Sequence, residues 1–216
     1  MSTSFSNLSG AVTRDIQQEL SPQEAFGWLE EGHARFKSQT PRNRDKAAML
    51  EGSSKGQFPY AAVLGCIDSR APIEQVFDAA IGDLFVARVA GNVVNPDVLG
   101  SLEYACKYAG TKVILILGHT SCGAVGAAWA GVDDGNITGL LKKIQPAVEK
   151  TRASHGDEGT PDTLNACVAA NVTEMCDALR TQSDILAGLE ADGSIVITGG
   201  VYNVGTGEVE FTHKPA

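Results

Sequence analysis

The chain has 216 residues and lacks the features that place a protein in a membrane or outside the cell. No apolar run approaches the roughly 18 residues that a membrane-spanning helix needs. The first twenty residues contain neither the basic segment nor the apolar segment of a secretory signal. We therefore expect a cytoplasmic protein that makes no contact with membranes.

Clusters of lysine and arginine are missing as well. The formal net charge is −9, so the chain has no general attraction to nucleic acid. Its five cysteines are an odd number without a secretory signal, which argues against a disulfide framework. Cys106, Cys167 and Cys176 fall in helical patterns and are expected to be buried thiols. Cys66 and Cys122 differ from them because each has polar neighbours.

Hydrophobic residues make up 43% of the chain, enough for a substantial core. Strand patterns alternate with helix patterns, which predicts an α/β fold: a mainly parallel central sheet flanked by helices. The expected strands cover 60–66, 83–92, 111–119 and 194–212, the last range including a turn. The expected helices cover 72–82, 96–110, 121–131, 136–153 and 163–191.

Residues 1–45 are predicted to form an N-terminal helical arm that packs on a partner subunit, ahead of a catalytic domain at 46–216. Within the arm, a helix should begin at Ser21 as its N-cap, with Pro22 in the first turn and Glu24 completing a capping box. The stretch 40–58 is expected to be a loop.

Polar side chains follow two of the predicted strands. Cys66, Asp68 and Arg70 alternate after the first strand, so an extended backbone places them on one face. His119 and Cys122 follow the strand at 111–119. Ligands bind beyond the carboxyl ends of parallel strands, and a Cys₂His set leaves zinc an open position, as in catalytic sites. Asp68 is a candidate fourth ligand.

The segments Cys-Ile-Asp-Ser-Arg at 66–70 and His-Thr-Ser-Cys at 119–122 resemble the motifs of β-class carbonic anhydrases. The similarity runs from Gln57 to Val125 and continues loosely toward the C-terminus. It implies one Zn²⁺ per chain, held by Cys66, His119 and Cys122, with Asp68 as fourth ligand in a closed form. It also implies a homodimer or a dimer of dimers.

The resemblance implies reversible hydration of carbon dioxide to bicarbonate and a proton by zinc-bound hydroxide. Asp68 would orient the zinc-bound water, and Arg70 would keep that carboxylate off the metal. The positions that match the substrate pocket of the family, partly contributed across the dimer, are Gln57, Phe85, Ala90, Tyr104 and Gly123.

Bicarbonate-inhibited members of the family use a tryptophan, an arginine and a tyrosine. Arg88 and Tyr202 match the arginine and the tyrosine, but Val63 stands at the tryptophan position. We therefore expect the bicarbonate switch to be weak or absent.

Three other interpretations stay open. The same scaffold could hydrolyse carbonyl sulfide or carbon disulfide. The chain could be a zinc-stabilised interaction protein without activity, although a broken Asp–Arg pair would be expected then. It could also be a metal-free thiol redox protein that uses Cys66 and Cys122.

Overall fold

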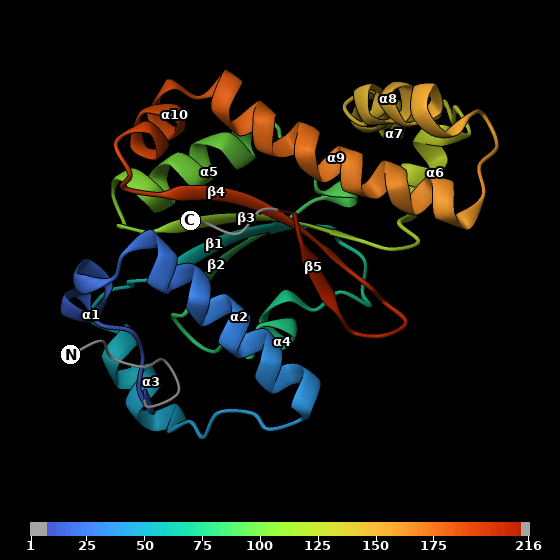
Figure 1. The fold of residues 1–216 in the computed structure, drawn as a ribbon. Coiled ribbons are helices and arrows are strands. Elements are labelled where there is room, and N and C mark those ends of the chain that lie inside the picture. Colours follow the sequence, from blue (N-terminus) through green and yellow to red (C-terminus); the bar gives the residue numbers. More distant parts are fainter. Residues whose placement is uncertain (1–7, 213–216) are drawn as a thin grey trace.

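The computed structural model describes residues 8–212, and Figure 1 shows a central sheet with helices on both faces. The strand order is β2-β1-β3-β4-β5; β1 to β4 run parallel and β5 pairs antiparallel with β4. The strands are β1 (Ala61–Gly65), β2 (Leu84–Arg88), β3 (Val113–His119), β4 (Val196–Tyr202) and β5 (Val209–Phe211). The predicted α/β class and its mainly parallel sheet are confirmed. No helix among the described residues is long and apolar enough to cross a membrane.

The two faces of the sheet divide the core by strand periodicity. On β1, Ala62 and Leu64 join one apolar cluster, whereas Ala61 and Val63 join the other. The upper cluster in Figure 1 lies under α5 (Pro96–Lys107), α6 (Gly123–Trp129), α7 (Gly135–Leu141), α8 (Gln145–His155), α9 (Pro161–Gln182) and α10 (Asp184–Ala191). The lower layer contains α1 (Arg14–Glu19), α2 (Pro22–Ser38), α3 (Lys46–Ser53) and α4 (Ile73–Val76).

The helix α2 starts as its sequence predicts. The Ser21 hydroxyl accepts a hydrogen bond from the Glu24 amide, and the Glu24 carboxylate accepts one from the Ser21 amide. Its apolar face packs on the underside of the chain's own sheet, with Trp28 edge-on to Tyr60 at 5.3 Å between ring centroids. The lower core therefore crosses the boundary predicted at residue 45. Contact between this arm and a second subunit stays a prediction, and residues 1–7 of the arm lie outside the described range.

Ion pairs fasten the segment after α2 to the rest of the molecule. Arg42 donates to the Asp83 carboxylate at 2.9 Å, and both side chains are buried. Asp78, another buried carboxylate, accepts hydrogen bonds from Arg35 and Arg44. Removing one partner of such a buried pair would leave an uncompensated charge. These pairs therefore fix the position of the segment after α2 relative to the sheet.

Five segments differ from the sequence prediction. The helix predicted at 72–82 is limited to α4, and the strand predicted at 83–92 ends at Arg88, before a 3₁₀ turn at Ala90–Asn92. The stretch 40–58 contains α3, capped by the Asp45 side chain, and is not loop throughout. The helix predicted at 136–153 is two helices, α7 and α8, separated near Ile144. The helix predicted at 163–191 also breaks, at Ser183, whose hydroxyl caps α10 and hydrogen-bonds Glu103 of α5.

The helix α9 lies unusually close to the sheet. A Cβ atom added to Gly118 would come within 2.7 Å of Val172, and one added to Gly199 would come within 2.4 Å of it. The two glycines therefore let Val172 press against β3 and β4. This contact sets the distance between α9 and the sheet near the carboxyl ends of those strands.

Candidate metal centre

Two parallel strands bring the thiol and imidazole groups together. Cys66 directly follows β1, His119 ends β3, and Cys122 is the N-cap residue of α6. The ligand atoms of these three side chains lie within 4.8 Å of one another, and all three residues are buried. Tetrahedral zinc at about 2.3 Å from sulfur and 2.0–2.1 Å from nitrogen fits inside such a group.

The His119 ring presents a free nitrogen to the two thiols. Its Nδ1 lies 3.0 Å from the Thr120 carbonyl oxygen, which can only accept, so Nδ1 carries the proton. The other nitrogen, Nε2, is buried and forms no hydrogen bond with any described residue. Metal-ligating histidines commonly donate their second ring N–H to a carbonyl in this way. The donor set and this unpartnered nitrogen therefore fit a metal ion.

The two thiols of the site behave as one coupled pair. A hydrogen bond from Cys122 is the main reason that the pKa of Cys66 falls to about 4, and the same contact raises the pKa of Cys122. The pair thus holds one proton at neutral pH, which a metal ion would displace. Burial by itself lowers the pKa of His119, but the neighbouring Cys66 thiolate, the Thr120 carbonyl and the Asp68 carboxylate together outweigh burial, and the net shift is upward.

The other cysteines are confirmed as buried thiols. Cys106, Cys167 and Cys176 are buried and free of disulfides. Burial raises the pKa of Cys106 and of Cys176 to about 12, so both stay protonated. They therefore do not compete as metal ligands.

Asp68 and Arg70 form a bidentate pair beside the thiols. Arg70 Nε donates to Asp68 Oδ1 at 3.0 Å and Nη2 donates to Oδ2 at 2.8 Å, while the Arg70 amide also donates to Oδ1. These bonds hold the pKa of Asp68 well below its usual range. Asp68 Oδ2 lies 3.8 Å from His119 Nε2, so the carboxylate stands next to the candidate metal position but faces the arginine.

Arg88 holds the loop that carries this pair. Its side chain donates to three backbone carbonyl oxygens, those of Cys66 at 2.9 Å, Asp68 at 2.6 Å and Ala71 at 3.3 Å. The sequence matched Arg88 to a bicarbonate position, or to an ion pair or a dimer contact, and did not predict these bonds to backbone carbonyls. Val63 is fully buried in β1, and Tyr202 is buried in the same lower core.

The predicted pocket residues fall into two groups. Ala90 and Gly123 lie at the metal centre, because Ala90 precedes the residue that hydrogen-bonds Cys66 and Gly123 follows Cys122. Gln57, Phe85 and Tyr104 lie at the other end of the strands: Gln57 precedes β1, and Phe85 pairs with Ala62 near the start of β1. Within one chain, the three residues of the second group do not reach the thiols.

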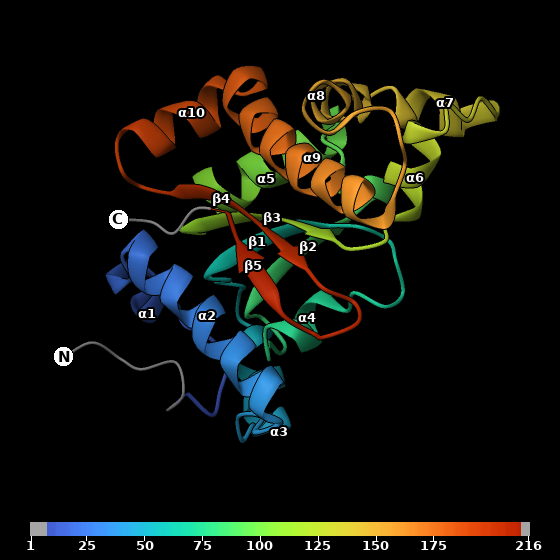
Figure 2. The ribbon, with the colours of Figure 1, turned by 45° about the vertical axis from the view of Figure 1, so that its right-hand side comes forward.

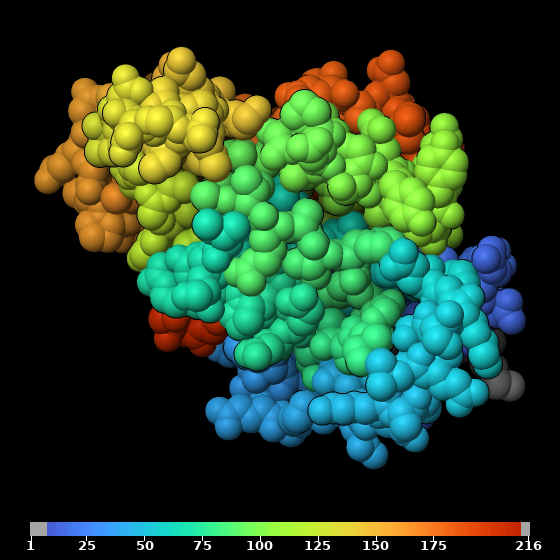
Figure 3. All heavy atoms as spheres, turned by 180° about the vertical axis from the view of Figure 1, so that it is seen from behind, coloured from blue at the N-terminus to red at the C-terminus, as the bar shows by residue number. Residues whose placement is uncertain are grey.

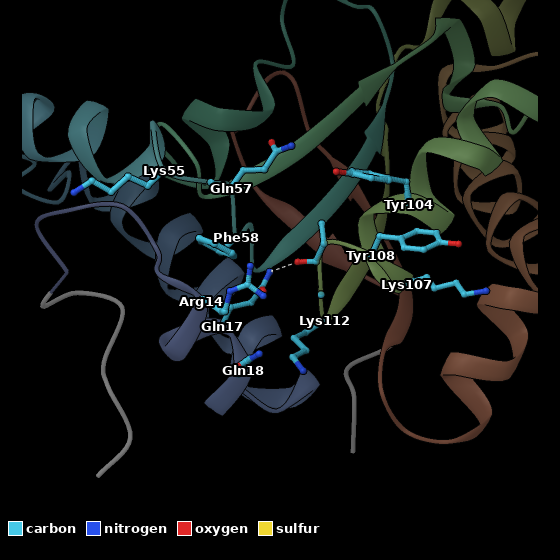
Figure 4. Close-up of a pocket in the computed structure, with 13 residues that line it drawn as sticks. Arg14, Gln17, Gln18, Lys55, Gln57, Phe58, Tyr104, Lys107, Tyr108 and Lys112 are labelled. Carbon is cyan, nitrogen blue, oxygen red and sulfur yellow. Dashed lines mark hydrogen bonds between the residues drawn. The ribbon is translucent and has the colours of Figure 1, made fainter.

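Gln57 and Tyr104 instead line a separate hollow of about 480 Å³. Figure 4 shows Tyr104 and Tyr108 on one side, Gln57 and Phe58 on the other, and α1 beneath, held by a hydrogen bond from Gln17 to the Ala109 carbonyl. Figure 3 shows the molecular face on which segments near residues 55 and 105 flank this depression. Its cationic lining residues are Arg14, Lys55, Lys107 and Lys112.

Comparisons with known proteins agree with this geometry. A family model described as carbonic anhydrase matches residues 61–209. The chain is 34% identical over 196 residues to carbonic anhydrase 2 of Mycobacterium tuberculosis, covering 87% of this chain and 91% of that protein. The β-carbonic anhydrase of Coccomyxa, solved with acetazolamide, has a TM-score of 0.69 at 27% identity and covers 88% of this chain and 84% of its own. A tetrameric β-carbonic anhydrase of Sordaria macrospora shares the fold, with a TM-score of 0.70 at 21% identity, covering 85% and 92% of the two chains.

Proposed function

The chain belongs to the β-class carbonic anhydrases, enzymes that hydrate carbon dioxide, and on this premise we propose that it works with one Zn²⁺ held by Cys66, His119 and Cys122. The observation that carries the proposal is the buried Nε2 of His119, which has no hydrogen-bond partner among the described residues and faces two thiols. When bound, zinc would supply a Lewis acid that lowers the pKa of a water ligand to about 7.

Asp68 and Arg70 would orient the attacking water. A carboxylate oxygen of Asp68, whose pKa Arg70 lowers further, can accept a hydrogen bond from that water and fix the direction of its lone pair. Arg70 occupies both Asp68 oxygens and so withholds them from the metal. An unheld carboxylate at this place would compete with water for the fourth position.

Gln57, Phe85 and Tyr104 would complete the pocket from a second subunit. The support is their position: the chain leaves them at the far end of its own strands, and Tyr104 is half exposed although it packs edge-on to Phe85. A homodimer or a dimer of dimers would give each metal centre these three side chains. A cytoplasmic location stays a prediction from the sequence.

Purified protein tests the ligand set directly. We expect about one zinc per chain by elemental analysis, and loss of both zinc and activity in Cys66→Ala, His119→Ala and Cys122→Ala. Loss of a group that only supports a ligand typically costs 10–100-fold in metal affinity, so loss of a ligand should cost more. Cys106→Ala is the matched control, because it removes a buried thiol outside the site. Full zinc occupancy in Cys122→Ala would show that the ligand set is wrong.

The alternative substrates need a separate assay. Carbonyl sulfide and carbon disulfide are linear molecules like carbon dioxide, and the same metal centre could act on them. Stopped-flow hydration of carbon dioxide and hydrolysis of both sulfur compounds should be measured on one zinc-loaded preparation. We expect carbon dioxide to have the highest kcat/KM; a higher value for either sulfur compound would overturn this assignment. Zinc-free protein with a reversible Cys66–Cys122 disulfide would favour the thiol redox interpretation.

A further inference from the structure

Asn171 is a polar side chain buried in the apolar layer between α9 and the sheet. Only 1% of its surface is exposed, and its neighbours along the helix, Val168, Val172 and Met175, belong to the upper core. Its Nδ2 donates to the Gly91 carbonyl oxygen at 2.9 Å, while Oδ1 forms no hydrogen bond with a described residue. A half-satisfied buried amide is unfavourable for stability, so the contact that its donor makes is of interest.

Gly91 connects this amide to the metal centre. The backbone N–H of Gly91 donates to the Cys66 sulfur at 3.3 Å. Gly91 and Asn92 both have positive φ angles, 67° and 45°, and a left-handed residue other than glycine is strained. Such a turn keeps its shape only where its surroundings fix it. The Asn171 bond to the Gly91 carbonyl is one such restraint, and it holds the turn from which the Gly91 N–H donates to the Cys66 sulfur.

A second asparagine of the same helix acts on the other thiol loop. Asn165 Oδ1 accepts a hydrogen bond from the Ser121 backbone amide at 3.0 Å. Ser121 also has a positive φ, 56°, and directly precedes Cys122. Asn165 and Asn171 thus each restrain a left-handed turn next to one of the two thiols.

The height of α9 over the sheet makes both contacts possible. Val172 fills the space left by Gly118 and Gly199, so the helix cannot move away from the sheet without opening a cavity. This packing sets the distance between α9 and the two cysteine loops, which the short side chains of Asn165 and Asn171 must span. Neither cysteine loop touches α9 through a charged group in these contacts; the restraint is by hydrogen bonds alone.

We propose that α9 is the positioning element of the metal centre, with Asn171 acting on Cys66 through Gly91 and Asn165 acting on Cys122 through Ser121. The inference rests on the proposed Zn²⁺ site. An N–H directed at a metal-bound thiolate stabilises its negative charge, and partners of this kind affect metal affinity by 10–100-fold. Both asparagines are positioning residues, since neither touches the ligand atoms.

The test measures metal binding as well as activity. Zinc affinity is measured by chelator competition, and the sulfur-to-metal charge-transfer absorption is recorded after Co²⁺ replacement. We expect Asn171→Leu and Asn165→Ala each to weaken zinc binding by about 10–100-fold and to shift the cobalt spectrum. Asn165→Asp keeps the accepting oxygen and should restore both readouts toward wild type. Thr173→Ala, which removes only a hydrogen bond within α9, is the control for helix stability.

Each outcome decides one point. Unchanged zinc affinity and an unchanged cobalt spectrum in folded Asn165→Ala and Asn171→Leu would overturn the inference and leave the zinc site intact. Absence of zinc from the wild type would instead overturn the proposed function. If Asn171→Leu does not fold, the Asn165→Ala and Asn165→Asp pair decides alone, because Asn165 is only partly buried. Equal loss in Thr173→Ala would show that helix stability alone explains the effect.

Discussion

Asp68 is controlled by one exposed side chain. Arg70 is 52% exposed, so the strength of the pair comes from its two parallel hydrogen bonds and not from burial. The pair holds the pKa of Asp68 well below its usual range, so the carboxylate stays ionised even in moderately acidic solution. The carboxylate is therefore able to bind a cation, and the arginine determines whether it does.

Arg70→Ala should retain zinc and lose most activity. Without the guanidinium, Asp68 is free to take the fourth position on the metal and exclude water. We expect kcat/KM for carbon dioxide to fall by at least about tenfold while zinc content stays near one per chain. Arg70→Lys should be intermediate, since lysine supplies charge without the bidentate geometry. A structure of Arg70→Ala with Asp68 turned away from the metal would contradict this account.

Arg88, which the sequence resemblance matches to the arginine of a bicarbonate switch, holds the 66–71 loop in this structure. Its donors bind three carbonyl groups of the 66–71 loop, and Val63 offers neither the hydrogen-bond donor nor the bulk of a tryptophan. A ligand without preference between two states cannot shift their equilibrium. We therefore expect simple, non-cooperative inhibition by bicarbonate in initial-rate measurements near pH 8. Sigmoidal inhibition that disappears in Arg88→Ala would show that the switch is present.

At the scale of whole elements, His33 joins three parts of the lower layer. Its Nδ1 lies 3.2 Å from the Val76 carbonyl of α4, and its Nε2 accepts the Val209 amide of β5 at 3.0 Å. Figure 2 shows α2 and α4 below the sheet, with the edge strand β5 between them. Only the bond from Val209 requires the neutral imidazole, because a protonated Nε2 cannot accept, whereas Nδ1–H can donate to the Val76 carbonyl in either state. Burial lowers the pKa of His33, against its hydrogen bond to Val76.

This contact makes stability depend on pH. The pKa of His33 is lower in the folded state, so its contribution is complete above the ordinary value of 6.5 and is lost as pH falls through the lower folded value. The charge of Lys37 opposes protonation of the His33 ring, and the charge of Glu208 favours it. The aromatic neighbours of the ring, Phe36 and Phe77, are uncharged.

The free energy of unfolding in urea at pH 7 and pH 5 tests this dependence. We expect the wild type to lose more stability between the two values than His33→Gln, which does not titrate but can keep both hydrogen bonds. Equal losses in the two proteins would exclude His33 as the cause.

The sequence predicted elements best where local pattern and tertiary structure agree. The strand at 111–119 is apolar throughout and is β3, and the capping box at Ser21 begins α2 as expected. The break at Ser183 was missed because its hydroxyl binds Glu103, which lies eighty positions away in the chain. The same limit applies at the site. The alternation of side chains along an extended backbone predicted that Cys66, Asp68 and Arg70 share one face. The proposed functions of Gly91 and Asn171 depend instead on how α9 packs.

At the scale of the whole molecule, the proposed dimer would join two halves of a pocket that lie far apart in one chain. The metal ligands lie at the carboxyl ends of the strands, and Gln57 and Tyr104 lie beside the amino ends. If a second subunit completes the pocket, two inactive variants with substitutions in different halves should complement each other. One chain would carry Gln57→Ala and Tyr104→Ala, and the other His119→Ala.

A mixed dimer of these chains has one intact site, made from the metal ligands of the first and the pocket side chains of the second. Random pairing at equal amounts makes half of the dimers mixed, so refolded mixtures should recover about a quarter of wild-type activity. A second chain carrying all three substitutions is the control and should restore nothing. Absence of recovery, with mixed dimers demonstrated by mass, would place the whole site within one chain.

The lower layer of the core is closed by both ends of the chain. Phe26 of α2 packs edge-on to Phe211 of β5 with ring centroids 5.0 Å apart, and His33 is 176 positions from its partner Val209. During synthesis at about 5–20 residues per second, α2 waits roughly 10–35 s for β5 to be made. During that time, on the ribosome, the apolar face of α2 lacks its packing partner β5. We therefore expect α2 to reach its final packing only after β5 has been made, so this contact forms late in folding during synthesis.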